Sequence, residues 1–206
     1  MDYNFSYIFT ILFTLLGPIK LIPPFAALTR GADGRFKRDV AIRGAVIASA
    51  LCAFVALAGG TLLSRYRISL DAVRIAGGLV LLIAALQVIF QRAHPSSPHS
   101  GKPTAIQLAT SPIAAPIIVP PAVVAVILTC MLLAGQNPGI TQSVAICLAI
   151  MMVLDFLVMY FIDRVMRTPG LMMVLSVLGS VLIFVQVGLA IQFVLHALKN
   201  LGVFKV

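Results

Sequence analysis

Six long apolar stretches occupy most of this 206-residue chain. Hydrophobic residues make up 61% of the chain and charged residues only 10%, a balance that excludes a soluble globular domain. A helix needs about 20 apolar residues to cross a bilayer, and each stretch is close to that length. We therefore expect an all-α integral membrane fold with six transmembrane helices, forming a single membrane domain over residues 1–206. The stretches run near residues 6–28, 40–63, 68–90, 107–134, 141–162 and 170–196.

The basic residues indicate how such a domain is oriented. If the N-terminus lies outside, nine Lys and Arg residues fall in the inner connections and five in the outer ones. Positive residues accumulate on the cytoplasmic side of membrane proteins, so we expect both termini outside. No basic region precedes the first stretch, which we therefore expect to remain as a helix and not to be cleaved as a signal peptide. We attribute the net charge of +9 to this orientation signal. The expected partner of the protein is therefore the lipid bilayer, not a nucleic acid.

Prolines interrupt the first and the fourth apolar stretch. A proline cannot donate the hydrogen bond to the carbonyl four residues earlier, so each interruption frees backbone acceptors and begins a new half-helix with free N–H donors. Inside a bilayer, such backbone is tolerated only where protein or a water-filled cavity satisfies it. We therefore expect the two interruptions to form a binding site. Its candidate residues are Gly17, Pro18, Ile19, Lys20, Pro23 and Pro24 in the first segment and Ser111, Pro112, Pro116, Pro120 and Pro121 in the second.

A polar, proline-rich linker over residues 93–106 divides the chain into two halves, about 5–92 and about 107–199. Each half contains three stretches and opens with an interrupted one. Because three is odd, consecutive copies must cross the membrane in opposite directions, which predicts two inverted three-helix repeats with a site at their interface. Each half also closes with a helix that carries small residues, which let neighbouring backbones approach closely. We expect helix packing at Gly77 and Gly78 in the first half and at Gly179 and Ser180 in the second.

Two charged residues lie deep within apolar stretches. Lys20 is in the first interruption, and Asp155 is in the fifth stretch. Charged side chains inside a membrane normally pair with one another or line a cavity, so we predict that Lys20 and Asp155 face each other in a central cavity. In the alternative, Lys20 extends its ammonium group towards the interface and Asp155 bonds locally.

The interruptions also suggest what the site binds. Freed carbonyls suit an ammonium group, and the N-terminus of a half-helix suits a carboxylate. Side by side, they match a small zwitterion such as an amino acid, although other small polar molecules would fit. In the alternative, the prolines are kinks that only shape the packing.

Several other function classes lack the residues that they require. There is no GxxxxGK[ST] motif for nucleotide hydrolysis, and no membrane-embedded His lies beside a nucleophile, so we expect no enzyme activity and no catalytic residues. Asp155 alone is too little for a divalent-metal exporter, and His94 and His99 lie in the polar linker. Three cysteines without a CxxC motif offer no zinc site. We expect no metal and no cofactor; a non-transporting scaffold remains the alternative to a transporter.

The interrupted segments and one glycine motif resemble those of the MarC family of bacterial membrane proteins. Gly17-Pro18-Ile19-Lys20-Leu21-Ile22-Pro23 is similar to the family's Asn/Asp-Pro-Ile-Gly-x-Ile-Pro, and Arg74-Ile75-Ala76-Gly77-Gly78 is similar to its Arg-Ile-x-Gly-Gly. Pro112-Ile113-Ala114-Ala115-Pro116 and Val119-Pro120-Pro121-Ala122-Val123 are similar to its Pro-Leu-Ala-x-Pro and Gly-Pro-Gly-Ala. The resemblance covers essentially the whole chain. It implies a multi-pass protein of the bacterial inner membrane, in the wider lysine-exporter-like superfamily, that transports small neutral amino acids.

Three positions depart from the family pattern. Gly17 stands where the family has Asn or Asp, Lys20 stands where it has glycine, and Pro120-Pro121-Ala122 replaces Gly-Pro-Gly. Lys20 would either bind a substrate carboxylate or occupy the place of a coupling cation, and H⁺ and Na⁺ are both candidate coupling ions. The superfamily also includes thiol-electron relays, but no cysteine lies in either interruption. A homo-oligomer is compatible with the sequence.

Overall fold

The computed structural model describes residues 4–91, 104–110, 117–134, 138–167 and 170–203, and the regular structure in these ranges is helical throughout. Five helical stretches are apolar and long enough to cross a membrane: Phe5–Leu28, Gly34–Arg65, Leu70–Gln87, Gly139–Tyr160 and Met173–Asn200. The helices are α1 (Phe5–Leu16), α2 (Pro18–Leu28), α3 (Gly34–Arg65), α4 (Leu70–Gln91), α5 (Ala105–Leu108), α6 (Pro121–Ala134), α7 (Pro138–Tyr160), α8 (Ile162–Met166) and α9 (Leu171–Asn200). The predicted all-α membrane class is confirmed.

The fourth apolar stretch is not a single long helix in the described part of the chain. It contributes the short α5 and the 14-residue α6, which is apolar but shorter than the other membrane-crossing candidates. Residues 109–110 and 117–118 lie on either side of residues 111–116, which are outside the described ranges. They have π-helical backbone, in which each hydrogen bond spans five residues and not four as in an α-helix. Five long spans are therefore described where six were predicted.

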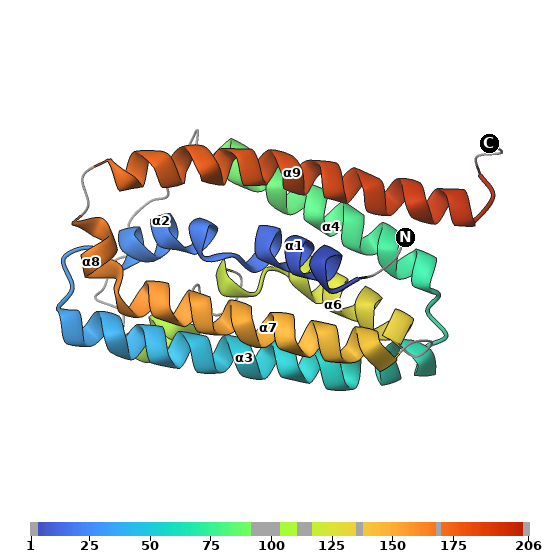
Figure 1. The fold of residues 1–206 in the computed structure, drawn as a ribbon, viewed down its shortest axis with the longest axis horizontal. Coiled ribbons are helices and arrows are strands. Elements are labelled where there is room, and N and C mark those ends of the chain that lie inside the picture. Colours follow the sequence, from blue (N-terminus) through green and yellow to red (C-terminus); the bar gives the residue numbers. More distant parts are fainter. Residues whose placement is uncertain (1–3, 92–103, 111–116, 135–137, 168–169, 204–206) are drawn as a thin grey trace.

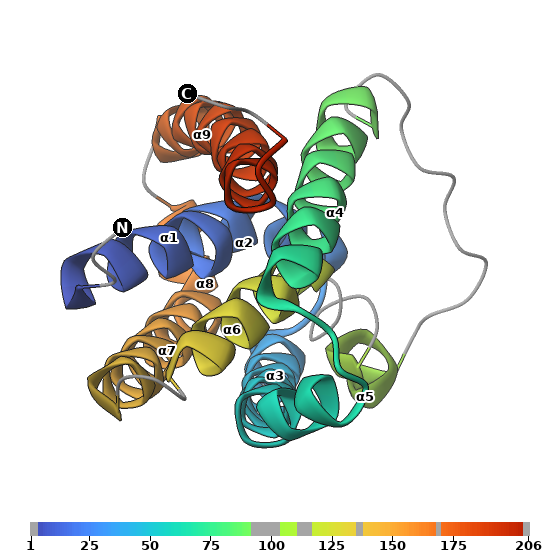
Figure 2. The ribbon, with the colours of Figure 1, turned by 90° about the vertical axis from the view of Figure 1, so that its right-hand side faces the viewer.

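The long helices lie side by side in one bundle (Figure 1). α4 and α9 pack together along one side, and α3 and α7 pack together along the opposite side. α1, α2 and α6 lie between these two pairs, as the end-on view also shows, whereas α5 lies beside α3 (Figure 2). α1 contacts α6 and α7, α2 contacts α7 and α9, and α6 contacts α3, α4 and α7. Of the two interrupted stretches, the described helices α1, α2 and α6 thus lie inside the bundle.

Apolar side chains cover both the inside and the outside of this bundle. Phe25, Leu12 and Met151 are among the side chains that are completely buried. Leu57 is 82% exposed and Phe184 is 80% exposed. Exposure of large apolar groups on this scale is normal only where lipid, not water, surrounds the protein.

The first interruption is confined to one residue. α1 ends at Leu16, α2 begins at Pro18, and Gly17 between them has extended backbone with φ −56° and ψ 148°. Pro18 takes the first helical position, where the missing N–H costs nothing. Pro23 and Pro24 lie inside α2, which continues to Leu28.

The second interruption is described only on its C-terminal side. Pro121 begins α6, and the N–H of Val123 donates to the carbonyl oxygen of Pro120 at 2.9 Å. Ser111, Pro112 and Pro116 lie outside the described residues.

Gly77 and Gly78 lie where α4 meets its neighbours. A Cβ atom at Gly77 would be 2.7 Å from the Cβ of Ala125 in α6, and one at Gly78 would be 2.7 Å from the carbonyl oxygen of Ala190 in α9. The packing expected at Gly179 and Ser180 is not found in the same form. A Cβ at Gly179 would meet no atom within 4 Å, and the Ser180 hydroxyl donates within its own helix. The reason is that α9 approaches Gly78 of α4 through its later residues near Ala190, not through Gly179.

We expect Gly78→Ala to lower the melting temperature of the purified protein, whereas the matched change Gly179→Ala leaves it unchanged or raises it. Both changes favour the helix by about 1 kcal/mol. At Gly78 the new methyl group must push α9 away, at a cost of about 1–3 kcal/mol. Thermal unfolding in detergent measures both variants, and equal melting temperatures would contradict the close approach of α4 and α9.

Candidate functional site

Lys20 connects the first interruption to the opposite side of the bundle. It lies in the first turn of α2, and its ammonium group donates a hydrogen bond to the side-chain oxygen of Gln186 in α9. The amide nitrogen of Gln186 in turn lies 3.4 Å from the carbonyl oxygen of Leu81 in α4, a long hydrogen bond. Three helices therefore meet in one polar chain, which we call the polar centre (Lys20, Gln186 and Leu81).

The polar centre lies near mid-length of the bundle. Gln186 is close to the middle of α9, and Leu81 is close to the middle of α4. Gln186 is 8% exposed, Leu81 is buried, and Lys20 is partly buried. A cation held at this depth is costly unless it is bonded, and the bond to Gln186 supplies one partner.

The predicted pair of Lys20 and Asp155 is not formed in this structure. Asp155 is 1% exposed in α7, and within the described ranges neither of its carboxylate oxygens has a hydrogen-bond partner. α2 contacts both α7 and α9, and the Lys20 side chain reaches α9. Lys20 thus has a different partner, because the amide oxygen of Gln186 lies within its reach.

Gln186 was missed by the reasoning from sequence. Its signal is a single amide in the apolar run Phe184-Val185-Gln186-Val187, since a polar side chain in a membrane helix normally bonds to another helix. Which helix it would reach depends on the packing of α9 against α4 and α2, which no local pattern encodes.

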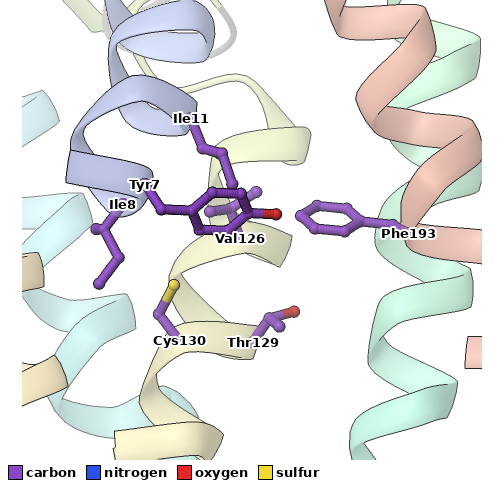
Figure 3. Close-up of a pocket in the computed structure, with 7 residues that line it drawn as sticks. All are labelled: Tyr7, Ile8, Ile11, Val126, Thr129, Cys130 and Phe193. Atoms are coloured by element: carbon purple, nitrogen blue, oxygen red, sulfur yellow. The ribbon is translucent and has the colours of Figure 1, made fainter. Parts of the chain in front are cut away.

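A small cavity lies between α1, α6 and α9 (Figure 3). Its volume is about 10 Å³, which is room for about one water molecule. Figure 3 shows the Tyr7 side chain extending from α1 across the cavity towards Phe193 of α9. The lining residues are Tyr7, Ile8, Ile11, Val126, Thr129, Cys130 and Phe193.

A larger groove of about 420 Å³ opens on the outer face between α3 and α7. Its lining is mostly apolar and consists of Ile42, Ala45, Val46, Ser49, Met152, Val153 and Phe156. Neither the groove nor the cavity includes Lys20, Gln186 or Asp155. The polar centre and the buried acid therefore lie outside both spaces.

Polar contacts join helices at both ends of the bundle. At one end, Lys37 of α3 pairs with Asp163 of α8 at 2.6 Å. At the other end, the side-chain amide of Asn200 in α9 donates to Asp71 of α4 at 3.0 Å, and Asp71 also pairs with Arg74. Within the described ranges, no group of three or more His, Cys, Asp or Glu residues comes together that could hold a metal ion.

Comparison with known proteins identifies the relatives of the chain. The model of the MarC family of integral membrane proteins matches residues 3–201. A UPF0056 membrane protein of Methanocaldococcus jannaschii is 25% identical over 205 residues, which is 95% of this chain and 96% of that protein. The UPF0056 membrane protein YvbG of Bacillus subtilis is 25% identical over 89% of this chain and 90% of its own length. The UPF0056 inner membrane protein YhgN of Escherichia coli is 27% identical over 63% of each chain. No solved structure gives a significant match.

Proposed function

Since the chain belongs to the MarC family of integral membrane proteins, we propose that it is a secondary transporter of the bacterial inner membrane. It carries small neutral amino acids, or similar small polar solutes, by alternating access. The observation that carries this proposal is the position of Lys20. This cation lies in the first helical turn after an interruption near mid-length of the bundle and is bonded to a neutral amide.

The architecture in this proposal has six spans in two inverted repeats. α5 and α6 together make the fourth passage, so α1–α2, α3 and α4 correspond to α5–α6, α7 and α9. The contacts support this correspondence, because equivalent helices pair with each other, α3 with α7 and α4 with α9. Contacts between non-equivalent helices of the two halves also have counterparts. The contact of α2 with α9 matches that of α6 with α4, and the contact of α1 with α7 matches that of α5 with α3. Such reciprocity is expected of two halves related by a twofold axis.

The end of the bundle that carries α8 faces the cytoplasm in this proposal. The end of α2 and the start of α3 lie at that end (Figure 1), and this region carries Arg30, Arg35, Lys37, Arg38 and Arg164. α1 begins and α9 ends at the opposite end. Positive residues mark the cytoplasmic side, so both termini lie outside.

Lys20 and the start of α2 form the carboxylate half of the proposed solute site. A solute carboxylate would replace the amide oxygen of Gln186 on the Lys20 ammonium group, next to the N-terminal end of α2. The exchange replaces a neutral acceptor by a charged one, which adds the attraction of opposite charges to the charge-assisted hydrogen bond that Lys20 already makes. The solute ammonium group is left for the carbonyls freed around the two interruptions.

Access from the two sides requires the two ends of the bundle to open in turn. The contact of Lys37 with Asp163 links the two halves at one end, and the contact of Asp71 with Asn200 links them at the other. Each contact is partly exposed to the aqueous side, so its rupture costs no more than about 1 kcal/mol. These contacts can therefore open and close without a large energy barrier.

Flux through reconstituted vesicles tests the proposed function. Purified protein in liposomes should take up radiolabelled alanine, glycine or serine faster than empty liposomes do. If an excess of unlabelled alanine does not reduce the flux of the labelled amino acid, a specific binding site is contradicted. No flux of any amino acid with a folded protein would instead support the alternative, a membrane scaffold without transport activity.

A further inference from the structure

Asp155 is a buried acid that the proposed solute site does not use. It is 1% exposed, and in the described part of the chain neither carboxylate oxygen has a hydrogen-bond partner. An ionised carboxylate without a partner costs several kcal/mol when it leaves water. A neutral carboxylic acid loses much less on burial. The packing around Asp155 therefore accommodates the protonated form.

The helices around α7 show which cation can replace that proton. α7 packs against α1, α2, α3, α6 and α8, and Cys52 of α3 lies within electrostatic range of Asp155. Lys20 is the one basic residue of α2. Four other basic residues near this end of the bundle have contacts elsewhere: Lys37 with Asp163, Arg43 with Asp39, Arg38 over the Tyr160 ring and Arg164 over the Phe161 ring. The remaining titratable side chains of these helices are Tyr7, Arg35, Arg65, Cys130 and Cys147.

We propose that Asp155 is the proton-binding residue of this protein, and that Lys20 moves from Gln186 to Asp155 when the proton leaves. In the present conformation Asp155 is neutral and Lys20 is bonded to Gln186. Release of one proton to water leaves a carboxylate that attracts the Lys20 ammonium group. The two charges then neutralise each other inside the bundle.

The geometry places α2 between the two partners of Lys20. α2 contacts α7 on one side and α9 on the other, and these three elements lie next to one another in Figure 1. α2 and α7 run in the same direction and end at the same end of the bundle. Lys20 lies eight residues before the end of α2, and Asp155 lies five residues before the end of α7. These separations correspond to roughly 12 Å and 7.5 Å along the respective helices, a difference of about 4.5 Å.

The movement of Lys20 between Gln186 and Asp155 couples proton binding to solute binding. This step rests on the transport function proposed above. When Asp155 is protonated, Lys20 carries an unbalanced positive charge that a solute carboxylate can neutralise. When Asp155 is ionised, its own carboxylate competes for Lys20. Proton and solute therefore favour each other's binding, and by linkage the effect is reciprocal.

Infrared spectroscopy tests proton binding without any transport assay. The six acidic residues of the chain are all aspartates, so a C=O stretching band of a protonated carboxylic acid can be assigned by substitution. We expect this band in the wild-type protein at pH 7, its loss in Asp155→Asn and its retention in Asp163→Asn. Asp163 is a suitable control because its side chain is 53% exposed and paired with Lys37. Absence of the band from the wild type at pH 7, or its persistence in a folded Asp155→Asn variant, would overturn the proposal.

A pH titration of the same band tests the role of Lys20. Raising the pH removes the proton, and Lys20 stabilises the carboxylate that results. In Lys20→Met this stabilisation is lost, so the band should persist to higher pH than in the wild type. An identical titration in both proteins would show that Lys20 is not the group that replaces the proton.

Flux measurements test the coupling separately. Wild-type vesicles should accumulate alanine when the outside is acidic, whereas Asp155→Asn should exchange labelled for unlabelled alanine without accumulating it. If a sodium gradient and not a pH gradient drives the wild type, the coupling role of Asp155 is wrong. If the wild type moves no solute while the infrared band behaves as expected, the transport function fails and proton binding by Asp155 stands.

Discussion

Replacement of Lys20 by methionine is expected to reduce alanine flux at least about 30-fold while the helical fold remains. Lys20 supplies the positive charge at the polar centre, and loss of one member of a desolvated charge contact costs about 2–5 kcal/mol of binding. Methionine is unbranched and one atom shorter than lysine, so it fills most of the same space beside Gln186. Initial rates of uptake into proteoliposomes, corrected for the amount of inserted protein, measure this effect.

The same substitution should change thermal stability much less than transport. It removes a charge-assisted hydrogen bond worth about 1.5–3 kcal/mol. It also removes the desolvation cost of holding an ammonium group away from water. This cost is as large as the contribution of the hydrogen bond, or larger, and its removal stabilises the protein. Circular dichroism during heating measures the net change.

Two controls separate a binding role from a general charge effect. Lys199→Met removes a positive charge from the exposed end of α9 and should leave flux unchanged. Lys20→Arg retains the charge and should preserve part of the flux. Wild-type flux in Lys20→Met would show that the solute carboxylate binds elsewhere.

Hydropathy was sufficient to predict the membrane class and most of the long helices, because burial in lipid requires long apolar helices whatever their tertiary arrangement. It was less successful at the fourth stretch. There hydropathy alone shows one apolar stretch, whereas the prolines predicted a break and the structure has two helices of different length, α5 and α6. Hydropathy reports how apolar a segment is, but not where its backbone leaves α-helical geometry.

The extent of the first interruption also differs from what the prolines suggested. The sequence marked eight residues from Gly17 to Pro24, but only Gly17 leaves the helix. Pro18 needs no hydrogen-bond partner at the first helical position. Within membrane helices, neighbouring helices can compensate for prolines, and α2 continues through Pro23 and Pro24. Proline spacing therefore located the interruption without giving its length.

Long-range partners were the least predictable part of the site. The two charged residues deep in the spans were visible in the sequence, and charge alone favoured their pairing. The structure instead bonds Lys20 to Gln186. Similarly, Gly78 and Gly179 belong to similar small-residue motifs, yet a close neighbour lies only at Gly78. In both cases the outcome depends on which helix faces the residue, which sequence periodicity does not specify.

The single-residue interruption makes Gly17 sensitive to a small substitution. We expect Gly17→Ala to destabilise the protein by about 1–3 kcal/mol, the usual cost of forcing atoms into filled space. A Cβ atom at this position would collide with the carbonyl oxygen of Phe13, which accepts the Gly17 N–H hydrogen bond at 2.8 Å. The backbone φ and ψ of Gly17 suit alanine, so the cost comes from this collision and not from backbone strain.

The collision should also affect transport, because relief requires α1 and α2 to tilt relative to each other. Such a tilt moves the first turn of α2 and shifts Lys20 away from Gln186. A loss of 1.4 kcal/mol at the site corresponds to about a tenfold loss of affinity, so we expect flux at low alanine concentration to fall by at least that factor. Gly188→Ala is the matched control, since a Cβ there would meet no atom within 4 Å. Equal melting temperatures and fluxes for the two variants would show that the interruption at Gly17 does not position Lys20.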